Sequence, residues 1–284
     1  MKVLVTGAAG QLGTELIDVL GRNGHEAVGT THTELDIRDG EAVASLVSRV
    51  RPDWIIHGAA WTAVDACEGD PDTAFAVNGV GSANVVAAAR AVDARVVYVS
   101  TDYVFDGTKS SPYVESDVPN PQSVYGASKL AGESAMGADD LIVRISWVCG
   151  FHGGNMVKTI LRLAGTNPRL SFVDDQIGHP TFADDAAAGI VRLVEADQRG
   201  IFHLTNQGAV SWYEFAREVL AAAGEDPDRV SPIATAELQP PRPAKRPANS
   251  VLENSALLAA GLPLLDDFRV PLKRLVDRLR ALPH

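Results

Sequence analysis

A tyrosine and a lysine stand four residues apart in the segment YGASK, as Tyr125 and Lys129. Residues four apart share one face of a helix, so the phenol and the ammonium group can address the same point. A free phenol has a pKa of about 10 and is a poor acid–base catalyst at neutral pH, but a nearby ammonium group favours its ionised form. The spacing also occurs by chance on helix surfaces.

Thr101, which ends the apolar segment RVVYVST, supplies a hydroxyl that can bind a carbonyl group. The three residues together predict acid–base chemistry at a substrate carbonyl, with Tyr125 as proton donor, Lys129 as its partner and Thr101 as the group that orients the carbonyl.

A glycine-rich turn near the start of the sequence predicts a dinucleotide site. Gly7, Gly10 and Gly13 follow the apolar segment KVLVT in the pattern GxxGxxG. Such a turn between a strand and a helix lets the backbone approach a diphosphate, which the free N–H groups at the start of the helix then bind. We therefore expect Gly7, Gly10, Gln11, Leu12 and Gly13 to bind a nicotinamide dinucleotide. The small residues of Gly58-Ala59-Ala60, after the third predicted strand, would let the backbone pass close to a ribose.

The end of the second predicted strand bears on the choice between NADH and NADPH. An acidic residue there usually accepts hydrogen bonds from the adenosine ribose and favours NAD. This sequence has Thr30-Thr31-His32 instead, its first carboxylate is Glu34, and no arginine stands ready in the segment. Thr31 and His32 could donate to a 2′-phosphate. The segment favours NADPH and leaves NADH open.

Short apolar strands alternate with helical patterns through the first half of the sequence, which predicts a parallel sheet covered on both faces. The expected strands are 2–6, 27–30, 54–57, 95–100 and 141–145, and the expected helices are 11–20, 41–50, 73–91 and 122–138. The fold class is therefore α/β, with a doubly wound parallel (Rossmann) sheet. We expect a dinucleotide-binding domain over 1–150. Residues 151–284 would form mainly a smaller, C-terminal substrate-binding lobe interleaved with the last sheet strands.

The second half has weaker patterns. Helices are expected at 154–165, 183–196, 211–223 and 267–281, and strands at 170–173 and 201–204. The proline-rich segment 240–247 is either a linker or a loop over the active site.

Composition excludes several classes of function. The formal net charge of −11 argues against a nucleic-acid surface, which needs clustered lysine and arginine. The apolar run of MKVLVTGAAG is shorter than the roughly 7–15 residues of a signal peptide, and no run approaches the ~18 of a membrane span. The two cysteines, Cys67 and Cys149, have no metal-ligand spacing, so a reduced pair in a cytoplasmic protein is expected.

Six segments together resemble the dTDP-4-dehydrorhamnose reductases, a branch of the extended short-chain dehydrogenase/reductases. They are WTAVDACE (61–68), VSTDYVFDG (99–107), NPQSVYGASKLAGE (120–133), RISWVCG (144–150), DDQIGHPT (174–181) and KRPANSVL (245–252). The resemblance covers nearly the whole chain. It implies NAD(P)H-dependent reduction of the 4-keto group of dTDP-4-dehydro-6-deoxy-L-mannose to dTDP-L-rhamnose.

The same resemblance assigns further residues. It places Thr62, Val64, Tyr103 and Trp147 beside the sugar, and Arg246 at the substrate diphosphate. Asp36 and Ile37 fall where related chains contact the adenine, and Asn78 matches an asparagine that holds neighbouring loops. Simpler roles stay open: Trp147 and Tyr103 as packing residues, Asp36 as a surface-turn residue, and Arg246 as a helix cap.

Alternatives to this reaction also follow from the resemblance. Nucleotide-sugar 4,6-dehydratases have Asp-Glu after the active-site threonine, whereas this sequence has Asp102-Tyr103, which favours simple reduction. A non-catalytic, cofactor-binding regulatory subunit and a reductase of another keto sugar nucleotide remain as rivals.

Some relatives form a metal-linked dimer through glutamates. Glu15 matches one of them and Asp184 loosely another, but there is no third ligand, so we assign no metal site and leave open Mg²⁺ binding and the choice between monomer and homodimer.

Overall fold

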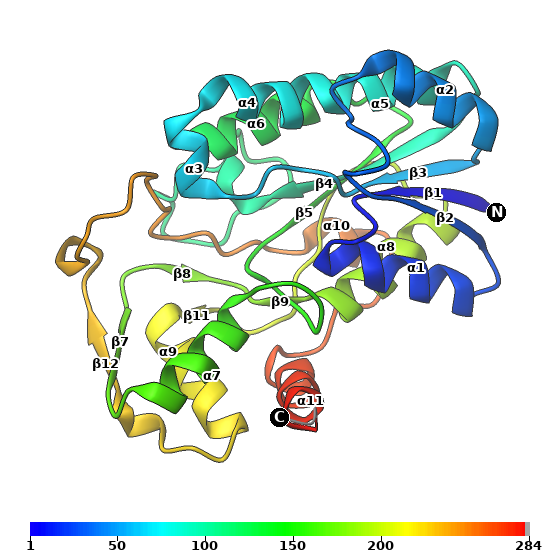
Figure 1. Ribbon diagram of the computed structural model, residues 1–284. Coiled ribbons are helices and arrows are strands. Elements are labelled where there is room, and N and C mark those ends of the chain that lie inside the picture. Colours follow the sequence, from blue (N-terminus) through cyan, green and yellow to red (C-terminus); the bar gives the residue numbers. More distant parts are fainter. Residues whose placement is uncertain (282–284) are drawn as a thin grey trace.

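The computed structural model describes residues 1–281 and is built on one six-stranded parallel sheet (Figure 1). The strand order is β10-β5-β4-β3-β1-β2. The strands are β1 (Lys2–Thr6), β2 (Glu26–Thr30), β3 (Trp54–His57), β4 (Arg95–Thr101), β5 (Leu141–Ile145) and β10 (Gly200–His203). The predicted doubly wound sheet is confirmed, and its sixth strand comes from beyond residue 150.

Helices cover both faces of this sheet because side chains alternate along each strand. Val3 and Val5 pack toward α1 (Gln11–Arg22) and α8 (Ala183–Glu195), whereas Leu4 packs toward α2 (Gly40–Val50) and α5 (Gly81–Arg90). The helix α6 (Val124–Glu133) lies on the second face, beside α5 (Figure 1). The burial of both faces explains why the strands are continuously apolar.

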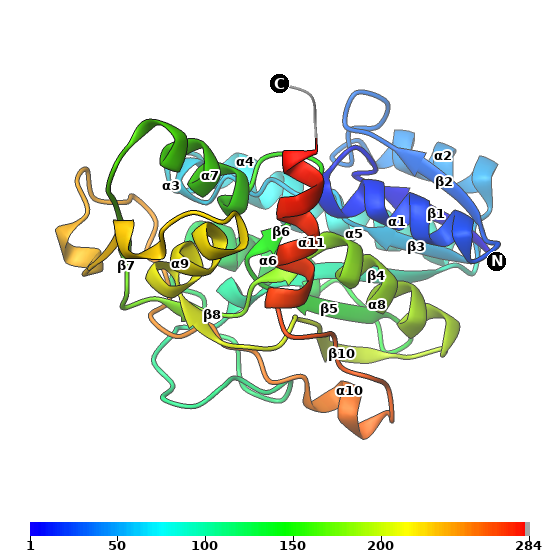
Figure 2. The same ribbon diagram turned by 90° about the horizontal axis from the view of Figure 1, so that it is seen from below.

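A smaller lobe carries a separate apolar core around Phe215 and Phe268. Its helices α7 (Met156–Thr166), α9 (Trp212–Ala222) and α11 (Arg269–Arg280) lie in the lower part of the view in Figure 1, and Figure 2 shows them from below, with α11 between α9 and α1. Three two-stranded ladders complete this half of the chain: β6 (Val148–Cys149) with β9 (Thr181–Phe182), β7 (Leu170–Val173) with β12 (Val230–Ile233), and β8 (Ile177–Gly178) with β11 (Val210–Ser211). A short helix, α10 (Ser255–Ala259), packs by β10.

Two helices have other bounds than the sequence predicts, so these two predictions were wrong. The helix expected over 73–91 is divided into α4 (Pro71–Phe75), a π-helical turn η1 (Ala76–Val80) and α5. Asn78 lies in that turn, where its carboxamide bonds to the backbone of Trp61 and to the Ser128 hydroxyl. The helix expected over 122–138 ends at Glu133, since the chain then turns so that the N–H of Gly137 donates to Asp140 at 2.8 Å. The helix α3 (Val64–Gly69) was not expected.

Candidate active site

A cavity of about 880 Å³ runs along the carboxyl edge of the sheet and reaches the smaller lobe. It is lined by every predicted catalytic and cofactor residue: Gly7, Gly10, Gln11, Leu12, Gly13, Thr31, His32, Asp36, Ile37, Ala59, Ala60, Thr101, Tyr125 and Lys129. Thr62, Val64, Tyr103 and Trp147 line it too. The carboxyl edge is where doubly wound sheets bind their ligands. Residues far apart in the sequence therefore share one site.

The glycine turn between β1 and α1 leaves no room for side chains. Gly7 has φ +72°, and a Cβ on it would lie 2.9 Å from the nitrogen of Ala59. A Cβ on Gly13 would lie 2.1 Å from the Gly7 carbonyl oxygen. The turn thus packs backbone against backbone and leaves the first N–H groups of α1 at the cavity, as a diphosphate requires. These residues fit a dinucleotide.

A buried hydrogen-bond chain holds β3 beside this turn. Thr6 Oγ1 lies 2.7 Å from Nδ1 of His57, whose Nε2 lies 3.1 Å from Ser82 Oγ. Because the Ser82 hydroxyl donates to the Asn78 carbonyl, the neutral imidazole donates to Ser82 and accepts from Thr6. Burial lowers the pKa of His57 to about 3, so it stays neutral. These hydrogen bonds fix the ends of β1 and β3 beside the glycine turn.

The adenosine end of the cavity contains an arginine that sequence reasoning missed. Arg38 lines the cavity and binds Asp36 through Nε and Nη2, with Nε 2.9 and 3.0 Å from the two carboxylate oxygens. This ion pair lowers the pKa of Asp36 to about 2. Glu34 accepts hydrogen bonds from the Thr31 N–H and hydroxyl at 2.9 and 2.8 Å. The segment 30–34 has no arginine, as expected, and Arg38 reaches the cavity from beyond that segment.

Tyr125 is placed by close packing of α6 on the turn that follows β4. The Ser123 hydroxyl caps α6 by accepting from the N–H of Gly126 at 3.1 Å. A Cβ on Gly126 would lie 2.2 Å from the Tyr103 carbonyl oxygen, so only glycine permits this approach. The Tyr103 ring meets the Tyr125 ring edge-on, with centroids 5.5 Å apart. As a result, Tyr125, Tyr103 and Thr101 border one part of the cavity.

Burial determines the protonation of Tyr125 and Lys129. It raises the pKa of Tyr125 above the usual value, and the nearby Thr101 hydroxyl offsets only part of this rise. It also lowers the pKa of Lys129 to about 7. Lys129 Nζ donates to the Val99 carbonyl at 2.8 Å and lies 4.0 Å from the Tyr98 ring centroid. The expected lowering of the phenol pKa by Lys129 is not what the structure shows, because the ammonium group is directed at Val99.

The smaller lobe closes the cavity with two stacked indoles. Trp147 and Trp212 lie 3.5 Å apart between centroids, at 7° to each other. Trp147 has φ +45°, a conformation that costs a non-glycine residue about 1–3 kcal/mol and often marks functional sites. Asn155 joins the lobe to the glycine turn, since its amide donates to Gln11 Oε1 at 2.9 Å. Neither Trp212 nor Asn155 stands in a motif that pointed to it.

Arg246 is the one predicted site residue that the structure does not place among the cavity-lining residues. Its guanidinium group binds both carboxylate oxygens of Asp65, in the first turn of α3. Asp65 also accepts from the N–H of Ala244 at 3.2 Å, so the ion pair anchors the proline-rich segment to α3. The proposed contact with a substrate diphosphate competes with this pairing.

The residues suggested for a metal do not fit a divalent cation. Glu15 and Asp184 line a cavity of about 230 Å³ together with Arg274 and Arg278. Arg274 binds Asp184 at 2.9 Å, and Arg278 lies 3.9 Å from Glu15. Two guanidinium groups thus supply the positive charge that an ion would bring. Within residues 1–281 no three potential metal-ligating side chains form a cluster. Among the helices of the same residues, none has the length and apolar character of a membrane span.

Comparison with known proteins agrees with the resemblance in the sequence. The family model "RmlD substrate binding domain" matches residues 1–281. A dTDP-4-dehydrorhamnose reductase of Streptomyces griseus is 42% identical over 95% of this chain and 91% of its own. A dTDP-4-keto-6-deoxy-D-glucose reductase of Streptomyces niveus is 41% identical over 91% of each chain. The crystal structure of dTDP-4-dehydrorhamnose reductase from Bacillus anthracis in complex with NADP matches with a TM-score of 0.93, at 36% identity over 98% of this chain and 99% of that one. Since the family model and these relatives extend over nearly the whole sequence, the chain belongs to the RmlD substrate binding domain family.

Proposed function

We propose that this protein reduces the 4-keto group of dTDP-4-dehydro-6-deoxy-L-mannose with NADPH and forms dTDP-L-rhamnose. The observation that carries the proposal is the meeting of Thr101, Tyr125, Lys129 and the glycine turn on one cavity. The full-length similarity to reductases of 4-keto sugar nucleotides supports it. An oxidoreductase of this kind works in the cytoplasm, where NADPH and nucleotide sugars are made.

The protonation of Tyr125 suits reduction. Burial keeps its phenol protonated at neutral pH, and reduction of a ketone requires a proton for the oxygen. The bound cofactor supplies the hydride. Tyr125 gives its proton to the oxygen that becomes the alcohol, and Thr101 stabilises the negative charge that develops there. The stacked pair of Trp147 and Trp212 forms an apolar wall, which suits the methyl group of a 6-deoxy sugar.

Three observations support NADPH as the preferred cofactor. Glu34, the first carboxylate after β2, is bound to Thr31 and does not line the cavity, and Asp36, which lines it, is paired with Arg38. Arg38 brings a guanidinium group to the adenosine end, where a 2′-phosphate would lie. A relative of 36% identity was solved with NADP.

The test is oxidation of NADPH or NADH with the substrate made in situ from dTDP-glucose. Adding the 4,6-dehydratase alone supplies the ketone before epimerisation, whereas adding the epimerase as well supplies the L-configured ketone. We expect rapid oxidation only in the second case, and dTDP-L-rhamnose as the product. Oxidation with the dehydratase alone would assign the substrate to the other ketone. No oxidation with either cofactor, although the cofactor binds, would favour a non-catalytic subunit.

A further inference from the structure

Asp102 is a buried carboxyl group in the cavity wall that has no role in the proposed reduction. It follows Thr101, opens the short 3₁₀ helix η2 (Asp102–Val104) and is 2% exposed. The Thr101 hydroxyl donates to Asp102 Oδ1 at 3.0 Å. The other oxygen, Oδ2, is buried and has no hydrogen-bond partner within residues 1–281. An ionised carboxylate needs partners for both oxygens, so this environment fits the protonated acid better.

The direction of this hydrogen bond decides what Thr101 can do for the substrate. A threonine hydroxyl has one proton to donate. The Thr101 oxygen already accepts from the Tyr103 N–H at 3.2 Å. If Asp102 is ionised, the Thr101 proton is directed to Asp102 and is not available to a ketone. If Asp102 is protonated, its carboxyl group can donate to Thr101, and the Thr101 proton turns into the cavity.

We infer that Asp102 acts as a protonated acid during turnover, donating to Thr101 Oγ1 so that the Thr101 hydroxyl donates to the substrate keto oxygen. Asp102 is then a positioning residue that works through Thr101 and keeps its own proton. Tyr125 still supplies the proton that ends on the product. The inference rests on the proposed function and adds to it the hydrogen-bond direction that the reduction requires.

The electrostatic surroundings support the protonated form. Burial raises the pKa of Asp102 to about 6, and the hydroxyls of Ser250 and Thr101 partly offset this rise. The Ser250 hydroxyl acts by its proximity, because it donates to the Ile177 carbonyl at 3.4 Å and leaves Oδ2 without a partner. The titratable groups around it are Tyr103 on its own turn, Tyr125 and Lys129 on α6, and the pair of Arg246 and Asp65 beyond Tyr103.

None of these groups holds Asp102 in its ionised form. Both phenols are neutral, since burial raises the pKa of Tyr103 to about 12 and that of Tyr125 as well. Lys129 is directed at Val99, and Arg246 is neutralised by Asp65. His179, near the segment that carries Ser250, is also neutral because burial lowers its pKa to about 4. A substrate diphosphate would add negative charge to the cavity and raise the pKa of Asp102 further.

The test follows the rate of a single hydride transfer between about pH 5.5 and pH 9, with enzyme and NADPH mixed against the ketone made in situ. The natural enzyme should lose rate about tenfold per pH unit above the pKa of Asp102. In Asp102→Asn the amide donates to Thr101 at every pH, so this fall should be absent. Ser250→Ala removes a hydroxyl that lowers the pKa of Asp102, so the fall should move to higher pH.

A fall that persists unchanged in Asp102→Asn would overturn the inference, as would a natural enzyme whose rate is flat over this range. If Asp102→Asn does not fold, the shift in Ser250→Ala decides instead. Infrared difference spectra of the complex with NADPH and dTDP provide a measurement without turnover: a protonated carboxyl band at neutral pH that disappears in Asp102→Asn supports the inference, and its absence contradicts it. A natural enzyme that oxidises no NADPH would refute the proposed function, whereas an active enzyme with an unchanged pH profile in Asp102→Asn would refute only the role of Asp102.

Discussion

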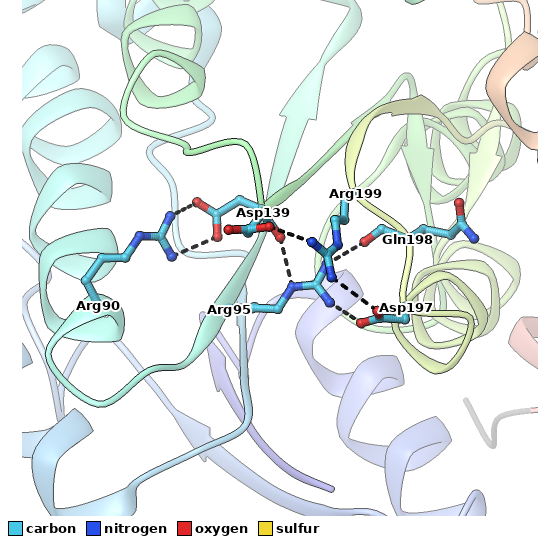
Figure 3. A network of polar contacts seen from close by, with 7 residues as sticks. Arg90, Arg95, Asp139, Asp197, Gln198 and Arg199 are labelled. Atoms are coloured by element: carbon cyan, nitrogen blue, oxygen red, sulfur yellow. Dashed lines mark hydrogen bonds and ion pairs between the residues drawn. The ribbon is translucent and has the colours of Figure 1, made fainter.

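The amino edge of the central sheet and the catalytic part of its carboxyl edge hold charged groups in different ways. At the amino edge, where β4, β5 and β10 begin, Arg90, Arg95 and Arg199 meet Asp139, Asp140 and Asp197 in a network of ion pairs (Figure 3). At the carboxyl edge, Asp102 and Lys129 are buried at 2% and 3% exposure, and neither is paired with an opposite charge.

This difference separates stability from function. The ion pairs at the amino edge join the starts of β4, β5 and β10. Buried groups with few partners have displaced pKa values, which is characteristic of sites that move protons. Substitutions at the carboxyl edge should therefore lower turnover without lowering the free energy of unfolding, whereas those at the amino edge should lower the free energy of unfolding.

The largest effect is expected for Tyr125→Phe. The variant lacks the phenol proton but keeps the ring packed against Tyr103. Since general acid catalysis contributes about 10²–10⁴-fold, kcat should fall by about a thousandfold. NADPH binding, measured by fluorescence titration, should change little, and so should the melting temperature. Turnover within about tenfold of the natural enzyme would assign the proton to another group.

At the opposite edge, Asp140→Ala should cost the most stability. The Asp140 side chain is fully buried, binds Arg90 through both oxygens and accepts from the N–H groups of Val96 and Gly137 at 3.0 and 2.8 Å. Alanine leaves these donors unsatisfied, so the free energy of unfolding should fall by about 3 kcal/mol in denaturant titrations. The neighbouring Asp139, whose side chain is 67% exposed, gives the matched control, and Asp139→Ala should cost far less. Equal losses in both variants would show that burial is not what distinguishes the two residues.

Lys129→Met should raise the free energy of unfolding and lower turnover, because Lys129 is buried and lines the cavity. Burial lowers the pKa of Lys129 to about 7 from 10.5, so the unfolded chain binds more protons between these values. Stability should therefore rise with pH across this interval. Methionine removes the cost of the buried ammonium group, and Lys129→Met should gain about 2 kcal/mol at pH 7 or below. The gain should shrink as pH rises toward 10.5; a variant less stable than the natural protein at every pH contradicts this account.

Much of the sheet could be predicted because its signals are local. The segments 54–57 and 141–145 are continuous apolar runs, and the structure has strands with the same bounds. The glycine turn and the pair of Tyr125 and Lys129 carry their spacing in the sequence itself.

Other features depend on contacts that no local pattern records. Asn78 turns an alanine-rich helix into a π-helical turn because its carboxamide bonds to Trp61 and Ser128. Arg38 reaches the adenosine end of the cavity only because the chain after β2 returns to the sheet. Asp102 could not be recognised as an unusual carboxyl group, since its lack of partners arises from tertiary packing. Their surroundings are assembled from parts of the chain that are far apart in the sequence, so no local pattern marks them.

Arg38→Ala tests the cofactor preference with a smaller effect. Removing the guanidinium group should raise KM for NADPH about tenfold and leave KM for NADH unchanged, because only NADPH carries the 2′-phosphate. Arg38→Lys keeps the positive charge but not the paired geometry, and should give an intermediate KM. Initial rates with each cofactor at saturating ketone measure both. An equal rise for the two cofactors would mean that Arg38 serves only to hold Asp36.

The smallest effect is expected for Arg199→Ala, at the exposed rim of the amino-edge network. Arg199 lies 2.6 Å from Asp139 and 3.4 Å from Asp197, but its side chain is 52% exposed and both partners are 67% exposed. Water screens the attraction in such exposed pairs, and the entropy lost in ordering two long side chains offsets the rest. The free energy of unfolding should therefore change by less than about 0.5 kcal/mol. Turnover should stay as in the natural enzyme. A loss above about 1 kcal/mol that disappears in high salt would show that the network acts as a unit, in which Arg199 orders Asp197 for the more buried Arg95.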